Sequence, residues 1–372
     1  MSGSVIVHGF YGAGNVGDEA ILSVLLRDLA RDAAVTPVVF SSRPREVRRL
    51  HGVPSLDPNG VAGLAGWWRL RRSRAFILGG GGLLKDYGES PEGARAWLRW
   101  LRRARGAGHQ RAVWAVGVEN LRFAETRRSI RETLEEVDLV TVRDEASMRR
   151  LREIGVTRPI GLAADPAVTL ADARRRVRRW RDRPRIAVCL RHWFRFGPTI
   201  ADPQQNERML DALARALDFA VAEWDARIEF VPFRTAGYDD DRRVMRSVSG
   251  RMRHGGDSIH QSRPTPERAA ELLADADLVV GMRLHSVILA TAAGVPTLAL
   301  SYMEKVADYM STIHQERYCM PVEEAAPDRL LDMLLALQRD YSSASAQLVA
   351  ASEALAARYA AARDDLIAMV RT

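Results

Sequence analysis

Cysteine and lysine are scarce in this 372-residue chain, which has only Cys189 and Cys319, and only Lys85 and Lys305. Two cysteines are too few for a disulfide framework, and no Cys/His spacing matches a zinc site. We therefore predict no metal centre and no bound cofactor. Long apolar runs are also missing: the most apolar stretch, Val287–Leu300, is interrupted by glycine and proline, whereas a membrane span needs about 20 residues. The absence of a signal-peptide pattern before the first apolar run predicts a cytoplasmic protein.

The chain carries an excess of basic residues, 55 against 47 acidic ones, which gives a net charge of +8. A basic domain invites a nucleic-acid function. The arginines, however, are interleaved with acids along the whole sequence, without a recognition-helix, zinc-finger or aromatic RNP pattern. We therefore predict no nucleic-acid partner. Every other basic residue is arginine. The two lysines therefore indicate positions where a compact ammonium group is preferred over the wide, planar guanidinium of arginine.

Apolar runs of four to six residues alternate with stretches of helical period, which predicts an α/β protein with mainly parallel sheets. In the first half the predicted strands are Val5–His8, Val38–Ser41, Ala75–Leu78, Ala112–Val116 and Leu139–Val142, and the predicted helices are Glu19–Leu29, Ala94–Arg105, Arg127–Glu136 and Glu145–Ile154. In the second half the predicted strands are Arg185–Leu190, Arg227–Pro232, Leu278–Gly281 and Thr297–Ser301, and the predicted helices are Glu207–Glu223, Asp240–Met252, Thr265–Ala274 and Leu284–Ala293.

The two series predict two Rossmann-like domains, residues 1–170 and 185–340, with ligands at the carboxyl ends of the strands in an interdomain cleft. Between them, residues 171–184 are charge-dense, have little apolar period and end in proline, so they are predicted to be a basic linker. Residues 341–372 are predicted to form a final helix that crosses back to the first domain.

A glycine-rich loop follows the first predicted strand, with Gly12, Gly14 and Gly17 among its glycines and a helix directly after it. Glycine lets a ligand approach the backbone, and a helix start attracts anions. Two interpretations remain open at this point. Asp18 either caps the helix or acts, with Asn15, as a hydrogen-bond partner for sugar hydroxyls or as a base.

Four consecutive glycines, Gly79–Gly82, come directly after another predicted strand and before Lys85 and Asp86. A tight turn needs one or two glycines, so four indicate that a ligand or a neighbouring segment packs against bare backbone near Gly80 and Gly81. Lys85 and Asp86 either form a surface ion pair or face the site.

The strand Leu278–Gly281 is followed by Arg283, Leu284 and His285 at the start of a helix. The apolar residues that follow have helical spacing and form a core face, so Arg283 and His285 are expected to point toward the site. Arg191 and Lys305 follow two other strands of the same predicted sheet. Arginine binds carboxylate or phosphate through a fork, and histidine moves protons near neutral pH, so this set suits a small polyanion.

In order along the chain, the segments GFYGAGNVGDEAIL, GGGGLLKD, TVRDEAS, AADPAV, GMRLHSVILATAAGVP and SYMEKV resemble the polysaccharide pyruvyl transferases. This resemblance covers residue 5 to about residue 306. It implies a GT-B-like fold, phosphoenolpyruvate as donor and a saccharide acceptor that receives a cyclic pyruvyl ketal. It also implies that Arg191, Arg283, Leu284 and His285 contact the donor. Two departures from the family pattern, Met303-Glu304 for Asp-Pro and His192 for Pro, leave the acceptor open.

The chemistry that the resemblance implies assigns each of these residues a role. Arg191, Arg283 and Lys305 would hold the carboxylate and phosphate of the donor, His285 would be the general acid, and Asp18 the base. Gly12, Asn15, Gly17, Gly80, Gly81, Lys85 and Asp86 would form the acceptor side or its loops.

Tryptophans beside arginines, at Trp67, Trp68, Trp97 and Trp100, are either core residues or a peripheral contact with an anionic membrane that carries a lipid-linked acceptor. Two other functions stay open. A GT-B-type glycosyltransferase that uses a sugar nucleotide would share the glycine loops, although no acidic pair for a ribose is evident. A non-catalytic basic protein would bind anionic polymers with steep salt dependence.

Overall fold

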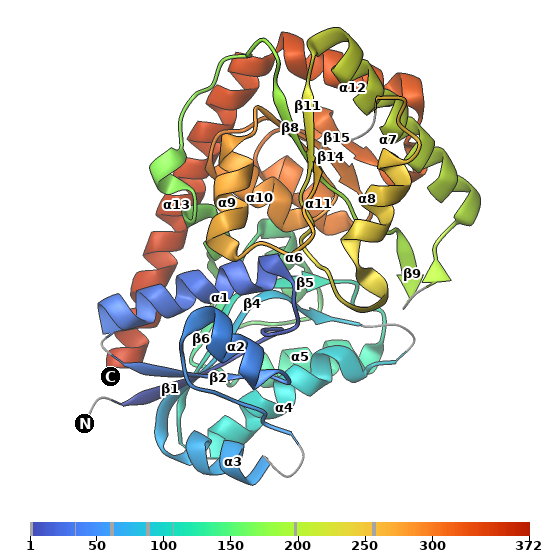
Figure 1. Ribbon diagram of the computed structural model, residues 1–372. Helices are drawn as coiled ribbons and strands as arrows, with labels where there is room; N and C mark the ends of the chain where they lie inside the picture. Colours follow the sequence, from blue (N-terminus) through green and yellow to red (C-terminus); the bar gives the residue numbers. More distant parts are fainter. Residues whose placement is uncertain are drawn as a thin grey trace. The chain divides into compact units, whose positions relative to one another are not determined.

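The computed structural model describes residues 3–33, 35–59, 63–86, 90–106, 108–196, 199–254 and 258–372. The chain divides into two compact units (Figure 1). Unit 1 comprises Met1–Pro166 together with Leu355–Thr372, and unit 2 comprises Ala167–Ala354. Each unit is built on its own parallel sheet.

In the described part of unit 1, seven parallel strands pair in the order β3-β2-β1-β4-β5-β6-β7. The central five contain the strands predicted from apolar runs, and the edge strands β3 and β7 are only two residues long. The bounds are β1 Ser4–His8, β2 Thr36–Phe40, β3 Ser55–Leu56, β4 Ser73–Lys85, β5 Gln110–Glu119, β6 Leu139–Val142 and β7 Gly161–Leu162.

Helices cover both faces of this sheet, with α1 on one face and α4 and α5 on the other (Figure 1). Phe76 and Leu78 of β4 belong to the same buried cluster as Leu98 and Leu101 of α4, whereas a Cβ on Gly79, the next residue of β4, would lie 3.2 Å from Leu25 of α1. The helix bounds are α1 Val16–Asp28, α2 Pro44–His51, α3 Gly63–Arg71, α4 Glu92–Gly106, α5 Ala124–Leu134 and α6 Glu145–Glu153.

In the described part of unit 2, six parallel strands pair in the order β12-β11-β8-β13-β14-β15. They are β8 Arg185–Cys189, β11 Arg227–Phe230, β12 Ser258–Ile259, β13 Leu278–Gly281, β14 Thr297–Ser301 and β15 Cys319–Pro321. A separate antiparallel pair is formed by β9 Phe194–Phe196 and β10 Thr199–Ile200. The helices are α7 Pro203–Trp224, α8 Asp241–Ser249, α9 Pro266–Asp275, α10 Leu284–Ala292, α11 Glu304–Thr312, α12 Pro327–Arg339 and α13 Tyr341–Arg371.

The final helix, α13, is a single element of 31 residues that begins in unit 2 and ends in unit 1. Within unit 1, the Tyr359 hydroxyl donates to the buried carboxylate of Asp28 at 2.6 Å, and the Tyr359 ring contacts Trp114 edge to face. These contacts attach the end of α13 to α1 and β5.

Residues 171–184, for which the sequence predicted a linker, belong to unit 2. Arg178 in this segment is buried and donates to the carbonyls of Ala274, Ala276 and Ala293, at 2.6, 3.2 and 3.2 Å. A single arginine thus satisfies three carbonyl groups near the ends of α9 and α10. The linker was predicted from the high density of charged residues, and this density alone cannot show that Arg178 is buried while other arginines of the segment are exposed.

The glycine run also differs from the prediction, because Gly79–Gly82 lie within strand β4 and not in a loop after it. The strand continues to Lys85 and pairs with β5, with a register shift between Gly81 and Leu84. Backbone hydrogen bonding to β5 therefore extends the strand beyond its apolar residues.

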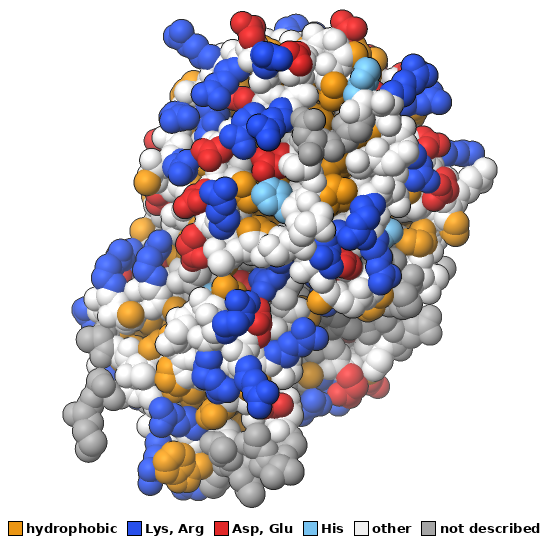
Figure 2. Space-filling view, in the orientation of Figure 1, with side chains coloured by type: hydrophobic (Ala, Val, Ile, Leu, Met, Phe, Trp, Pro, Cys, Tyr) orange, Lys and Arg blue, Asp and Glu red, His pale blue; other side chains and the backbone are white. Residues whose placement is uncertain are grey.

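None of the helices in the described ranges is long and apolar enough to cross a membrane. On the face shown in Figure 2, Lys and Arg side chains of the described residues are interspersed with Asp and Glu over both units. Many arginines also have acidic neighbours within 4 Å, such as Arg49 with Glu46 and Arg251 with Asp211. The basic excess is thus dispersed on this face, as the sequence predicted.

Candidate functional site

Three neighbouring strands of unit 2, β8, β13 and β14, end at the same edge of the sheet, because all three run parallel. Arg191 follows β8, Arg283 follows β13, and Tyr302 follows β14. Side chains at the carboxyl ends of adjacent parallel strands are the usual components of ligand sites in such folds. The structure thus brings two of the predicted cations to one edge, together with a tyrosine that the prediction did not include.

Arg283 is buried at the N-cap position of α10 and is held by two carboxylates. Its guanidinium donates to Asp239 Oδ1 at 3.0 Å, to Asp241 Oδ1, and through Nε to Asp241 Oδ2 at 3.3 Å. Asp241 also accepts the backbone N–H groups of Phe233 and Arg234, both at 2.9 Å. Burial raises the pKa of Asp241, and the positive charge of Arg283 opposes this rise. Arg283 therefore joins β13 to the segment after β11.

Arg191 and Lys305 surround the ring of Tyr302. The Arg191 guanidinium carbon lies 4.3 Å from the ring centroid and Lys305 Nζ lies 5.6 Å from it, within the range of cation–π attraction. Burial raises the pKa of Tyr302, but Lys305, Arg191 and Arg283 together outweigh it and lower the value to about 7. The phenol of Tyr302 therefore ionises near neutral pH.

His285 lies in the first turn of α10, two residues after Arg283, and is 9% exposed. Leu284 between them is buried and belongs to the apolar core. His192 follows Arg191, and burial lowers its pKa, partly offset by Asp239. The edge of unit 2 thus combines two histidines, the cations Arg191, Arg283 and Lys305, and the carboxylates of Asp239 and Asp241.

In unit 1 the first glycine loop is held by its own side chains. Asn15 is the N-cap of α1, and its Oδ1 accepts the Gly17 N–H at 3.2 Å, so Asn15 and not Asp18 caps the helix. Asn15 Nδ2 donates to Asp18 Oδ2 at 2.5 Å. The Gly12 N–H donates to the buried Glu19 at 2.7 Å, and the φ of Gly12 is +74°, which favours glycine.

Protein side chains account for the four-glycine run in β4. A Cβ on Gly80 would overlap Cγ2 of Ile21, and a Cβ on Gly81 would lie 2.8 Å from Oδ1 of Asp18, so α1 packs against bare strand backbone. A Cβ on Gly82 would lie 2.5 Å from Oε1 of Glu119. Neighbouring segments, α1 and β5, therefore pack against this backbone, which is one of the two occupants that the sequence indicated.

Lys85 and Asp86, at the end of β4, have separate partners. Lys85 Nζ lies 3.8 Å from Glu119 Oε2, at the end of β5. The buried Asp86 accepts the N–H groups of Arg122 and Phe123 at 2.6 and 3.0 Å and the Thr126 hydroxyl at 2.5 Å. Asp86 therefore stabilises the start of α5. These contacts pair Lys85 with Glu119 and Asp86 with the start of α5, in place of the surface ion pair between Lys85 and Asp86 that was one of the two predictions.

The prediction missed a buried charge network at the carboxyl edge of the unit 1 sheet. Arg143, which follows β6, lies 3.1 Å from Glu119 Oε1, 3.1 Å from Asp144 Oδ2 and 4.0 Å from Asp165 Oδ2. Arg143, Glu119 and Asp165 are each 6% exposed or less. The signal was present in the sequence, since Arg143 and Asp165 stand directly after apolar runs in the segments TVRDEAS and AADPAV.

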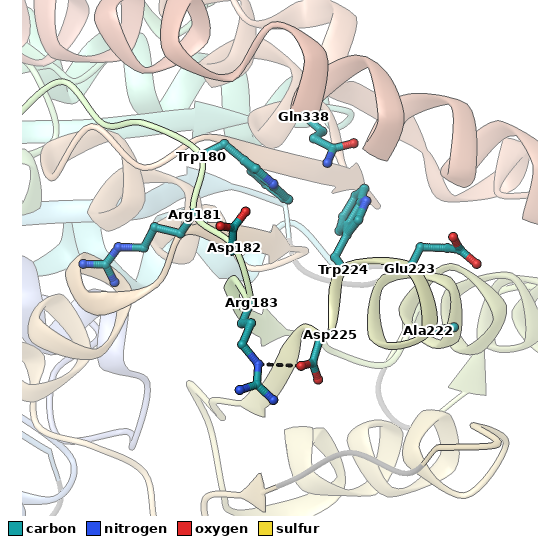
Figure 3. A pocket seen from close by; sticks show the side chains of 9 residues that line it. All are labelled: Trp180, Arg181, Asp182, Arg183, Ala222, Glu223, Trp224, Asp225 and Gln338. Carbon is teal, nitrogen blue, oxygen red and sulfur yellow. Dashed lines mark ion pairs between the residues drawn. The ribbon is translucent and has the colours of Figure 1, made fainter.

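A hollow of about 370 Å³ in unit 2 contains none of the predicted site residues (Figure 3). It lies before the first residues of β8 and β11, at the amino edge of the sheet, and Arg183 and Asp225 on its rim form an ion pair. Its lining residues are Trp180, Arg181, Asp182, Arg183, Ala222, Glu223, Trp224, Asp225 and Gln338. The hollow therefore lies at the edge of the sheet opposite to the candidate site.

Of the tryptophan–arginine groups considered for membrane contact, the structure buries Trp100 and half-buries Trp97, and both rings pack around His8. These two are core residues. Trp68 is 50% exposed, and the guanidinium of Arg72 lies 3.8 Å from its ring.

The two parallel α/β units, with charged side chains at the carboxyl edge of each sheet, place the chain among GT-B-like proteins. The MnaA–UDP structure of S. aureus matches at 10% identity and a TM-score of 0.62, covering 94% of this chain and 91% of that one. A putative UDP-N-acetylglucosamine 2-epimerase of Listeria monocytogenes matches at 12% identity and 0.62, with the same coverage. A glycosyltransferase of Rickettsia africae matches at 11% identity and 0.59, covering 100% and 98%. At these identities the likeness concerns the fold alone.

The sequence itself identifies the family. The model of the polysaccharide pyruvyl transferases matches residues 15–304, and the chain belongs to this family, which is a family of enzymes. A search of curated protein sequences gave no match. The matched range contains Arg143, Arg191, Arg283 and Tyr302, and it ends one residue before Lys305.

Proposed function

We propose that this enzyme transfers the pyruvyl group of phosphoenolpyruvate to a saccharide, forming a cyclic ketal and releasing phosphate. The observation that carries the proposal is the arrangement of Arg191, Lys305 and Tyr302 at one edge of unit 2, where His285 begins helix α10 two residues after Arg283. Phosphoenolpyruvate is a small molecule with a carboxylate and a phosphate, and fixed guanidinium and ammonium groups bind such anions. Arg283 supports this edge through its pairs with Asp239 and Asp241.

The chemistry requires a proton donor for the enol ether. Carbon C2 becomes electrophilic when C3 is protonated, and a sugar hydroxyl then adds to C2. His285, in the first turn of α10 and two residues after Arg283, is the proposed donor of this proton. A second hydroxyl of the same saccharide then displaces phosphate from C2 and closes the ketal.

The proposed acceptor residues are in unit 1. Asn15 and Asp18 are hydrogen-bonded to each other in the glycine loop, and amide and carboxylate groups bind sugar hydroxyls well. Asp18 is the proposed base that takes the hydroxyl proton. Gly12, Gly17, Gly80 and Gly81 act indirectly, because they permit the loop and helix α1 to hold Asn15 and Asp18 in place.

Phosphate release from phosphoenolpyruvate, measured with a panel of saccharide acceptors, tests this function. We expect release that depends on the acceptor and falls by about 10²–10⁴-fold in His285→Ala, the usual contribution of a general acid. His285→Gln keeps most of the side-chain volume and separates loss of the proton donor from a packing defect. His254→Ala, an exposed histidine of the same unit, is the matched control and should behave as wild type.

Two results would contradict the assignment. Near wild-type turnover in both His285 variants, with unchanged melting temperatures, would remove His285 as the acid. Absence of phosphate release with every acceptor, together with stabilisation by a sugar nucleotide, would favour a glycosyltransferase instead.

A lipid-linked acceptor and peripheral contact with an anionic membrane are further parts of the proposal, and exposed Trp68 with Arg72 supports them. Flotation with anionic and neutral vesicles at low salt tests the contact, with Trp68→Ala as the variant. Equal recovery of wild type and Trp68→Ala from both vesicle types would contradict it.

A further inference from the structure

The proposed reaction needs more proton transfers than His285 alone provides. Two hydroxyl groups of the saccharide each lose a proton when the ketal forms. One proton is gained by C3, which becomes a methyl group, and the other is gained by the phosphate as it leaves. The first transfer accompanies addition to C2, and the second accompanies cleavage of the C2–O bond. A second acidic group near the phosphate would therefore assist the second step.

Tyr302 is placed to be this group. It follows β14, one strand from Arg283 and two strands from Arg191, at the edge where the anionic donor is proposed to bind. Arg191 and Lys305 lie within 6 Å of its ring. A phosphate held by these two cations would lie close to the phenol of Tyr302.

We propose that Tyr302 donates its phenolic proton to the bridging oxygen of the departing phosphate, an inference that rests on the proposed function. The second sugar hydroxyl forms its bond to C2 while the C2–O bond to phosphate breaks, and the electron pair remains on the bridging oxygen. That oxygen takes the Tyr302 proton. The phenolate then regains a proton that originates from the second hydroxyl, so the residue is unchanged after turnover.

The other charged groups at this edge are less suited to the role. Arg191 and Arg283 stay protonated in proteins and supply charge but no proton. Asp239 and Asp241 are engaged with Arg283, and Asp239 also lies 3.4 Å from Arg191. The cations that surround Tyr302 lower the pKa of its phenol to about 7, which suits proton donation at neutral pH.

The two acids can be distinguished in heavy water with an acceptor that supports the wild type. In Tyr302→Phe the first step remains, so the adduct forms, cannot lose phosphate readily, and reverts to phosphoenolpyruvate that carries deuterium at C3. We expect retained deuterium exchange, phosphate release reduced by about 100-fold, and a KM for phosphoenolpyruvate within about threefold of wild type. His285→Ala should lose exchange and release together.

The pH profile gives a readout that a packing role would not change. In the wild type, kcat for phosphate release falls on the alkaline side as the Tyr302 phenol ionises, and this limb is absent in Tyr302→Phe. Tyr318→Phe is the matched control, because Tyr318 also contacts an arginine, Arg317, but precedes β15 at the opposite edge of the sheet. It should keep wild-type kcat and the alkaline limb.

The other possible results separate the role of Tyr302 from the proposed function. Tyr302→Phe with wild-type phosphate release, or with loss of deuterium exchange as well as release, would overturn the assignment while the proposed function stands. Wild-type protein without phosphate release for any acceptor would overturn the proposed function and this assignment with it. A near-ultraviolet titration checks the ionisation directly: a tyrosinate band that appears near neutral pH should be missing in Tyr302→Phe only.

Discussion

Replacement of Gly80 by alanine tests whether the four-glycine run exists for packing or for a ligand. The new Cβ would overlap Cγ2 of Ile21 in helix α1, and Gly80 has a φ of +23°. Overpacking of a buried site costs about 1–3 kcal/mol. A non-glycine residue held in an unfavourable backbone region costs about 1–3 kcal/mol more. We therefore expect Gly80→Ala to lower the free energy of unfolding by about 2–6 kcal/mol, a large part of the typical total.

Urea unfolding of four variants separates the two parts of this cost. Gly14→Ala is the matched control, since Gly14 has a φ of +79° but nothing within 4 Å of its added Cβ, so only the backbone part applies. The double variant Gly80→Ala with Ile21→Ala should recover about 1–3 kcal/mol relative to the sum of its single variants, because the overlapping methyl is gone.

Either of two results would show that packing against α1 is not the reason for the four-glycine run. One is a Gly80→Ala variant that loses no more stability than Gly14→Ala. The other is strict additivity of Gly80→Ala and Ile21→Ala. If Gly80→Ala instead kept its stability and lost only activity, the bare backbone of β4 would be a ligand surface.

Two further predictions concern buried charges. Burial lowers the pKa of His8 to about 4, partly offset by its hydrogen bond to the Phe40 carbonyl, so between pH 6.5 and 4 the unfolded chain binds a proton that the folded chain does not. Stability should therefore fall by about 3 kcal/mol as the pH is lowered through this range, and His8→Phe should lack this part of the fall in urea titrations at each pH; equal slopes for both proteins would contradict the burial argument. Asp241→Asn leaves Arg283 with one carboxylate in place of two and should lower the free energy of unfolding by about 3–5 kcal/mol while raising the KM for phosphoenolpyruvate. Unchanged unfolding in Asp241→Asn would show that Asp239 alone satisfies Arg283.

The central strands of both sheets could be predicted because each is a short apolar run that ends in a polar or glycine-rich segment. The edge strands β3, β7, β12 and β15 could not, since two or three residues carry no period and their pairing depends on a neighbouring strand. The length of β4 could not be predicted either. Its glycines have the composition of a loop, and only hydrogen bonding to β5 extends the strand to Lys85.

The candidate site was predicted from residues that closely follow apolar runs, and this rule selected Arg191, Arg283 and His285. It could not show that Arg283 is shared between Asp239 and Asp241, because these partners are more than 40 positions away in the sequence. Nor could it show the lowered pKa of Tyr302, which depends on cations that follow three different strands, Arg191 after β8, Arg283 after β13 and Lys305 after β14. Sequence spacing indicates which side chains reach an edge, whereas the balance of charge there depends on long-range neighbours.

Helix α13 has a consequence for the order in which the protein assembles during synthesis. Unit 1 needs both Met1–Pro166 and Leu355–Thr372, and the bond from Tyr359 to Asp28 joins these two segments. All residues of unit 2 lie between them, so they have been synthesised before the last helix of unit 1 is available. Unit 1, whose first segment precedes all of unit 2 in the chain, is thus completed after unit 2, and until then the surfaces of α1 and β5 that receive Tyr359 remain open to solvent or to chaperones.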